Sequence, residues 1–234
     1  MKTLHELFVD GIKDMYNAEK QLTKALPKMA KMAKDQRLKE GFQNHLKQTE
    51  EHIRRIEEAA MSLDMKPSGM VCRAMKGLIE EANEHTKGLK PSSCTDAELI
   101  QLAQKVEHYE IGSYGTLCEW GRLMGHETAM QLLHQNLQEE KDTDSLLTEI
   151  AETEVNQMAA EESKQMMMDG NRTAATKRRT TPTKPPARGA PGRAKARVTG
   201  SHSKGTTSGR GKTVSRGKTS GRSKGSARGK ASAR

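Results

Sequence analysis

The chain has 234 residues, 30% of them charged and 3% aromatic, and its formal net charge is +10. This charge averages two unlike parts, because the segment from Asn171 to the C-terminus contains 19 Lys and Arg residues and no Asp or Glu, which leaves −9 on the first 170 residues. The N-terminal stretch MKTLHELFVDGIKDMY is interrupted by charges and no later run reaches membrane-spanning length, which argues against a secretory signal and a membrane protein.

Such an asymmetry predicts a globular module followed by an interaction segment. We expect one domain over residues 1–168 and a Lys/Arg-rich tail over residues 169–234. The tail has no aromatic residue and few apolar ones, so it cannot bury enough surface to offset its ordering entropy and is predicted to be disordered. Cys72, Cys94 and Cys118 lack the paired spacing of a zinc site, which favours reduced thiols in a cytoplasmic protein.

The first half of the domain is predicted to be helical, because its apolar residues recur three and four positions apart. A first helix is expected over residues 3–33, with a kink at Pro27, and a second over residues 36–63. A polar connection follows, which carries a shorter helical segment over residues 69–87.

The second half repeats this pattern. A third long helix is expected over residues 95–125, with Thr95 as its N-cap and acidic residues in its first turn. A fourth is expected over residues 127–165. Four long amphipathic helices with one long middle connection predict an all-α four-helix bundle with a crossover.

Acidic residues on the apolar faces of these helices are the first functional signal. Glu19, Glu110 and Glu140 occupy positions where the helical period calls for a core residue, with Glu107 and Asp144 one turn away. A buried carboxylate needs a proton, a partner or a metal. Aligning residues 15–26 with 106–117 places Glu19 opposite Glu110, as expected for the dinuclear centre of a ferritin-like bundle. The alternative is that these side chains bury only their stems and keep their heads in water.

The second and fourth helices each supply half of the Glu-x-x-His pattern of di-iron bundles. On the second helix Thr49 takes the place of the glutamate that would accompany His52, and Glu50 is the nearest substitute. On the fourth, Glu140 is followed by Thr143, and Asp144 is the candidate replacement for the histidine. Nitrogen and oxygen ligands of this kind suit iron, manganese and zinc alike.

Several segments resemble the YciF/YciE family of ferritin-like proteins (DUF892). They are LFVDGIKDMYNAEKQLTKALPKMAK, HLKQTEEHIRRIEE, QKVEHYEIGSYGTLCEW and LQEEK, and the resemblance spans roughly residues 2–160. It implies a rubrerythrin-like bundle, a tendency to dimerise, a di-metal site and a link to bacterial stress responses. We therefore expect a homodimer with a centre of iron or manganese. On this resemblance Glu19, Glu107, Glu110 and Glu140 are the best candidates for conserved acids.

The tail lies outside this resemblance, and its chemistry points to nucleic acid. Neutralising phosphates releases condensed counterions, so the charge run predicts tight, salt-sensitive and sequence-independent DNA binding. Without aromatic residues no preference for single strands is expected. The residues predicted to contact phosphates are Lys177, Arg178 and Arg179 and the members of a six-residue repeat, Arg210, Lys212, Arg216, Lys218, Arg222, Lys224, Arg228 and Lys230.

Other roles for the tail stay open at this stage. It could improve solubility, bind an acidic partner or anionic lipid, or fold back on its own acidic domain. For the whole protein, the leading hypothesis is a ferritin-like dimer held on nucleoid DNA by its tail. The alternatives are a di-metal oxidase or peroxidase that the tail only localises, and a metal-free dimer that bridges two DNA segments.

Overall fold

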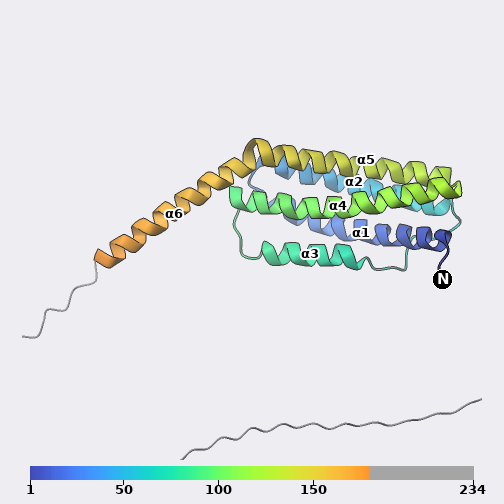
Figure 1. Ribbon diagram of the computed structural model, residues 1–234, viewed down its shortest axis with the longest axis horizontal. Coiled ribbons are helices and arrows are strands. Elements are labelled where there is room, and N and C mark those ends of the chain that lie inside the picture. The colour runs from blue at the N-terminus through green and yellow to red at the C-terminus, as the bar shows by residue number, and fades with distance from the viewer. Residues whose placement is uncertain (180–234) are drawn as a thin grey trace, which may run out of the picture. The chain divides into compact units, whose positions relative to one another are not determined.

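The computed structural model describes residues 1–179, with side chains described through Asp169, and this part of the chain is all-helical. The long helices of the bundle are α1 (Leu4–Met32), α2 (Gln36–Met61), α4 (Ser93–Met124) and α5 (Glu127–Ile150) (Figure 1). α1 packs against α2 and α4 against α5, and the two hairpins meet through α2 with α5 and α1 with α4. The predicted all-α four-helix bundle is therefore confirmed.

The starts of these helices follow from capping side chains that satisfy otherwise unpaired backbone N–H groups. Thr3 and Glu6 form a reciprocal capping box at α1, and Asp35 accepts from the backbone of α2. α1 continues across Pro27 to Met32. The prediction of Thr95 as the N-cap of α4 is wrong: Ser92 is the cap and accepts from the Thr95 N–H at 3.1 Å.

The crossover between α2 and α4 carries the short helix α3 (Arg73–His85), which is four residues later in its start than predicted and lies against α1 and α4. Two contacts fasten it to α1. The Cys72 N–H donates to Asn17 Oδ1 at 2.8 Å, and Gln21 Nε2 donates to the Cys72 carbonyl at 3.0 Å. All three cysteines are free.

The C-terminal helix differs from the prediction of one helix over residues 127–165. α5 is followed by one π-helical stretch, η1 (Ala151–Val155), and then by α6 (Asn156–Arg179), which runs on past the end of the bundle (Figure 1). Residues 169–179, predicted as disordered tail, are helical. The proximal part of α6 is held at the start of α4, where Glu162 Oε2 accepts from the Ser93 N–H at 2.7 Å. The rest of the predicted tail, 180–234, lies outside the described residues.

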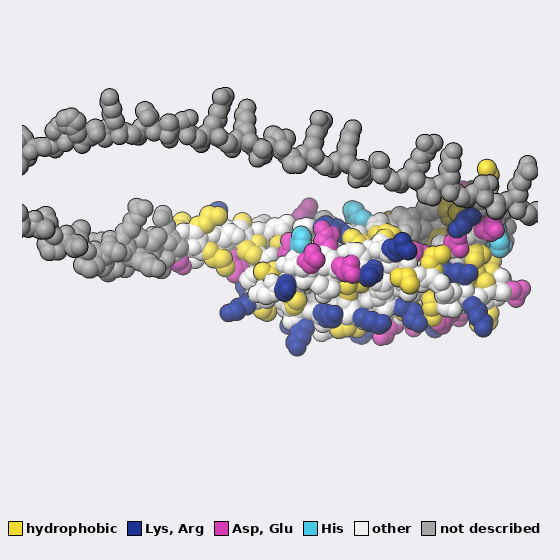
Figure 2. Space-filling view, turned by 90° about the horizontal axis from the view of Figure 1, so that it is seen from below, with side chains coloured by type: hydrophobic (Ala, Val, Ile, Leu, Met, Phe, Trp, Pro, Cys, Tyr) yellow, Lys and Arg dark blue, Asp and Glu magenta, His cyan; other side chains and the backbone are white. Residues whose placement is uncertain are grey.

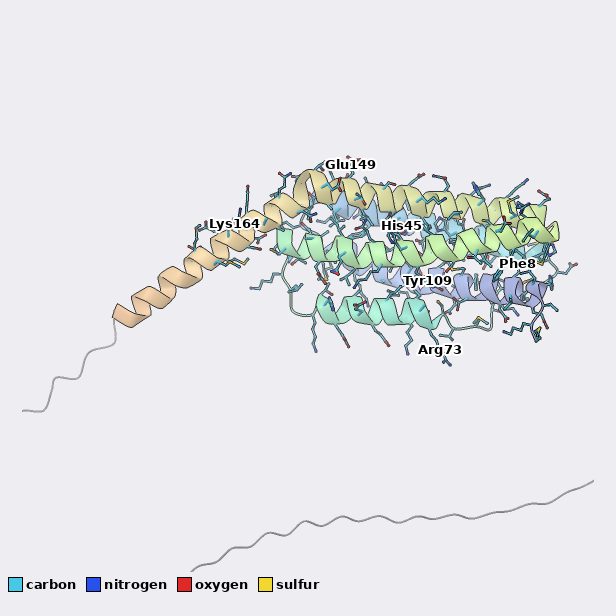
Figure 3. The ribbon with its side chains drawn as sticks, viewed as in Figure 1. Phe8, His45, Arg73, Tyr109, Glu149 and Lys164 are labelled. Carbon is cyan, nitrogen blue, oxygen red and sulfur yellow. The ribbon has the colours of Figure 1, made fainter. Side chains whose placement is uncertain are left out.

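The core fills the space between the four long helices with the apolar stripes that the sequence predicts. On α1 it includes Phe8, Ile12, Met15, Leu22 and Leu26. Figure 3 shows His45 between helices inside the bundle and Phe8 nearer the end that holds the N-terminus. Over residues 1–179 no helix is long and apolar enough to cross a membrane.

Candidate metal centre

Six histidine and glutamate side chains meet in the middle of the bundle, and all four long helices contribute. They are Glu19 from α1, His45 and His52 from α2, Glu107 and Glu110 from α4, and Glu140 from α5. Each of them is at most 2% exposed. Their convergence follows from helical spacing, because residues three, four or seven apart on one helix share a face and here share the inward face.

The first of two ligand groups, which we call subsite A, consists of Glu19, His52 and Glu140. His52 Nδ1 lies 3.3 Å from Glu19 Oε1 and 3.0 Å from Glu140 Oε1. Three helices therefore place one imidazole nitrogen between two carboxylates.

The second group, subsite B, consists of His45, Glu107, Glu110 and Glu140. His45 Nε2 lies 3.4 Å from Glu107 Oε1 and 3.6 Å from Glu140 Oε2. Glu140 belongs to both subsites through its two oxygens. It would therefore serve as a ligand in either group.

These six residues carry an unusual concentration of unsatisfied polar atoms. In the part of the chain with described side chains, eight buried side-chain nitrogen and oxygen atoms lack a hydrogen-bond partner, and all eight belong to this set. They include both oxygens of Glu110 and both of Glu140. An unpaired buried polar atom costs about 1–3 kcal/mol, so such a concentration calls for a ligand.

Without a metal ion to neutralise the acids, burial and neighbouring charges shift the pKa values of these side chains. Burial, together with the neighbouring carboxylates, raises the pKa of Glu107 and of Glu110 well above the usual value. Burial also raises the pKa of Glu19. Burial alone would lower the pKa of His52, but the adjacent Glu19 and Glu140 raise it to about 11. Burial alone would raise the pKa of Glu140, but contact with His52 and the nearby His45 hold it below the usual value.

The donor set fits a pair of divalent transition-metal ions. Four ionised carboxylates carry the charge that two such ions neutralise, and the two histidines add nitrogen ligands. Within each subsite the ligand atoms lie within 4.8 Å of one another. These residues would therefore hold an ion within each subsite and offer it both nitrogen and oxygen ligands.

Five of the seven ligands predicted from sequence are brought together here: Glu19, His52, Glu107, Glu110 and Glu140. The other two are not. Glu50 is exposed. Asp144 is one-quarter exposed and accepts from Gln104 at 3.1 Å, with His108 Nε2 at 3.3 Å.

The sequence prediction did not include His45 among the candidate ligands. Its signal was a seven-residue separation from His52, two helical turns on the same face. In the structure the Thr143 hydroxyl lies 3.3 Å from His45 Nδ1. His45 of α2 therefore lies beside the position on α5 at which the Glu-x-x-His pattern lacks its histidine. Thr49, which stands where a glutamate was sought, donates its hydroxyl to the His45 carbonyl at 2.8 Å.

A four-helix bundle with a long crossover and inward-facing carboxylates and histidines defines the ferritin-like class of proteins. The family model described as "Domain of unknown function (DUF892)" matches residues 3–160. The chain belongs to this family, as the resemblance of its sequence segments predicted.

Relatives of known structure agree with this assignment. The chain is 45% identical to protein YciF of Escherichia coli K12 over 160 residues, which is 68% of this chain and 96% of that protein. The crystal structure of the E. coli stress protein YciF matches with a TM-score of 0.64 over 67% of this chain and 99% of that one. The YcfI protein from Rhodopseudomonas palustris, 41% identical, matches with a TM-score of 0.61 over 63% and 94%.

Proposed function

We propose that this protein holds two divalent metal ions, iron or manganese, in its bundle and binds duplex DNA without sequence preference through its basic C-terminal segment. The observation that carries the metal assignment is the set of eight unsatisfied polar atoms on six buried residues. The ions would be held by Glu19, His52 and Glu140 at subsite A and by His45, Glu107, Glu110 and Glu140 at subsite B. Ions bound in this way supply redox and Lewis-acid chemistry.

The DNA assignment rests on charge. The basic residues after position 170 are unaccompanied by any acid, and their regular spacing provides an even positive charge density. On the side of the bundle seen in Figure 2, Lys and Arg side chains follow the lower edge, and Asp and Glu side chains lie mainly above them. The net −9 of the first 170 residues opposes direct contact between the bundle and phosphates.

Together the two parts place a metal-binding bundle on DNA. A bundle that takes up iron or manganese there lowers the concentration of free ions next to the nucleic acid. A role under stress is supported by a relative that is described as a stress protein.

Metal analysis tests the first half of this proposal. Protein purified without chelator and reloaded with Mn²⁺ should retain about two ions per chain, as expected for two subsites. Glu140→Ala should lose both ions, because Glu140 belongs to each subsite, and the double variant Glu19→Ala/Glu110→Ala should do the same. Equilibrium dialysis followed by elemental analysis measures the ratio.

Two variants of the remaining predicted ligands serve as matched controls. Glu50→Ala on α2 and Asp144→Ala on α5 each remove one acid that lies outside the cluster, and both should keep the wild-type ratio. Wild-type protein that retains no metal, or a Glu140→Ala variant that retains both ions, would refute the assignment.

A further inference from the structure

Arg55 starts a hydrogen-bond network that leads to two residues of the candidate metal centre, His52 and Glu19. It lies on α2, one turn after His52, with its side chain 13% exposed. Its guanidinium forms a bidentate pair with Glu139 of α5. Nη2 donates to Glu139 Oε1 at 2.8 Å, and Nη1 donates to Glu139 Oε2 at 3.0 Å. Glu139 Oε2 in turn lies 2.9 Å from His52 Nε2. This first arm therefore runs from Arg55 through Glu139 to a ligand of subsite A.

A second arm starts from the same guanidinium. Arg55 Nη1 donates to Asn136 Oδ1 at 3.0 Å, and Asn136 Nδ2 donates to the Tyr114 hydroxyl at 3.1 Å. The Tyr114 hydroxyl donates to Glu19 Oε1. Asn136 and Tyr114 are fully buried. Each donor in this arm points toward Glu19, so the bonds polarise one another and strengthen its last member.

Both arms leave free the ligand atoms that a metal ion needs. When His52 donates its Nε2–H to Glu139, the lone pair of Nδ1 faces Glu19 and Glu140. A metal-binding histidine is commonly oriented in this way by a carboxylate. Tyr114 occupies Oε1 of Glu19, while Oε2 of Glu19 is one of the unsatisfied atoms.

Subsite B has no comparable support. Among the described residues, the polar side-chain contact behind His45 is the Thr143 hydroxyl at 3.3 Å. The carboxylates of Glu107 and Glu110 contribute three of the unsatisfied oxygens. His45, Glu107 and Glu110 must therefore be ordered when an ion binds at subsite B, whereas Glu19 and His52 of subsite A are already held by their hydrogen bonds, and Glu140 is common to both subsites.

We propose that Arg55 is a positioning residue that pre-forms subsite A, so that the two metal positions are unequal and subsite A fills first. This inference rests on the proposed metal function and adds an order of filling to it. The physical reason is that a ligand set fixed in advance loses less conformational entropy on binding. Outer partners of metal ligands contribute about 10- to 100-fold in affinity.

Titration of the full-length protein with Co²⁺ tests the inference, because Co²⁺ bound to nitrogen and oxygen ligands reports each step by its visible absorption. Wild-type protein should show two steps of different affinity. Arg55→Met should weaken the first step about 10- to 100-fold, toward or below the affinity of the second, and leave the second nearly unchanged. Arg55→Lys keeps the positive charge but cannot form a bidentate pair with Glu139. It should therefore recover part of the affinity of the first step.

Arg54→Met is the matched control. Arg54 is the preceding residue on α2, half exposed, and pairs with Glu51 and Glu58 on its own helix. This variant should titrate like wild type. Circular dichroism shows whether Arg55→Met folds. If it does not, Tyr114→Phe replaces it in the titration. This variant removes a single hydroxyl from the second arm and should still weaken the first binding step.

The outcomes separate this inference from the function on which it rests. Two identical steps in wild type, or equal weakening of both steps in Arg55→Met, would overturn the order of filling and leave a two-metal protein. Wild-type protein that binds no Co²⁺ would overturn the metal function itself.

Discussion

Truncating the chain after Arg179 should reduce its affinity for duplex DNA by several orders of magnitude at low salt. The cut removes 15 of the 19 positive charges that follow residue 170 and leaves Arg172, Lys177, Arg178 and Arg179. Each neutralised phosphate contributes about −0.9 to the slope of log affinity against log salt, so full engagement of 19 charges would give a slope of about −17, an upper bound. Fluorescence anisotropy with a labelled duplex, at salt concentrations from about 50 to 200 mM, measures both the affinity and the slope.

Two full-length variants distinguish charge density from spacing. Changing the nine Lys and Arg residues of the six-residue repeat, from Arg210 to Arg234, to Gln should reduce the steepness of the slope by up to about 8. Shuffling residues 208–234 at constant composition should leave both affinity and slope unchanged, because counterion release depends on charge density and not on register. A truncated protein that still binds DNA with wild-type affinity would show that the bundle, and not the tail, makes the contact.

Raising the pH should destabilise the metal-free protein and favour the metal-loaded one. Free glutamic acids titrate near 4.5, but Glu19, Glu107 and Glu110 keep their protons to higher pH in the folded protein. Between pH 4.5 and their raised pKa values the folded state therefore binds more protons than the unfolded state, so the free energy of unfolding falls as pH rises. His52 acts in the same direction between pH 6.5 and about 11.

The expected size of this effect is about 1.4 kcal/mol per pH unit for each proton that the folded state retains and the unfolded state releases. Glu140 acts in the opposite sense, because its pKa is lowered in the folded protein. Its contribution to the free energy of unfolding is lost only as the pH falls below about 4.5, the usual pKa of a glutamic acid. Metal binding requires deprotonated ligands and releases these protons, so the stabilisation by Mn²⁺ should increase with pH. Urea denaturation at pH 5.5, 7.0 and 8.5, with chelator and with Mn²⁺, measures both trends.

The double variant Glu107→Gln/Glu110→Gln isolates the contribution of subsite B. Neutral amides remove two of the retained protons, so the metal-free variant should lose stability less steeply with pH than wild type. It should also lose the ion at subsite B and the stabilisation that this ion provides. A metal-free wild type whose stability rises between pH 5.5 and 8.5 would contradict the buried, protonated state of these acids.

Much of the bundle could be predicted because its determinants are local. The spacing of apolar residues sets which face of each helix turns inward, and the same rule marked Glu19, Glu110 and Glu140 as acids on an inward face. The length of the middle connection indicated a crossover. The separation of acidic bundle and basic tail is a property of composition and needs no coordinates.

The differences between the predicted ligand set and the cluster in the structure come from contacts that sequence spacing does not contain. Glu50 is adjacent in sequence to the buried Thr49, but neighbours on a helix point about 100° apart, and the packing of α2 leaves Glu50 in solvent. His45 comes from another helix and lies beside Thr143, where the Glu-x-x-His pattern calls for a histidine. Which of two helices supplies a ligand depends on how their faces are rotated toward each other.

The sequence by itself thus determined the helices, their inward acids and the charge of the tail, because each follows from residues a few positions apart or from composition. Only the tertiary structure decided that His45 joins the cluster and that hydrogen bonds connect Arg55 to Glu19 and His52. Those links run through Glu139, Asn136 and Tyr114, residues 59 to 84 positions from Arg55 in the chain. Partners so distant are brought into hydrogen-bond range by the packing of helices, and no local pattern encodes that packing.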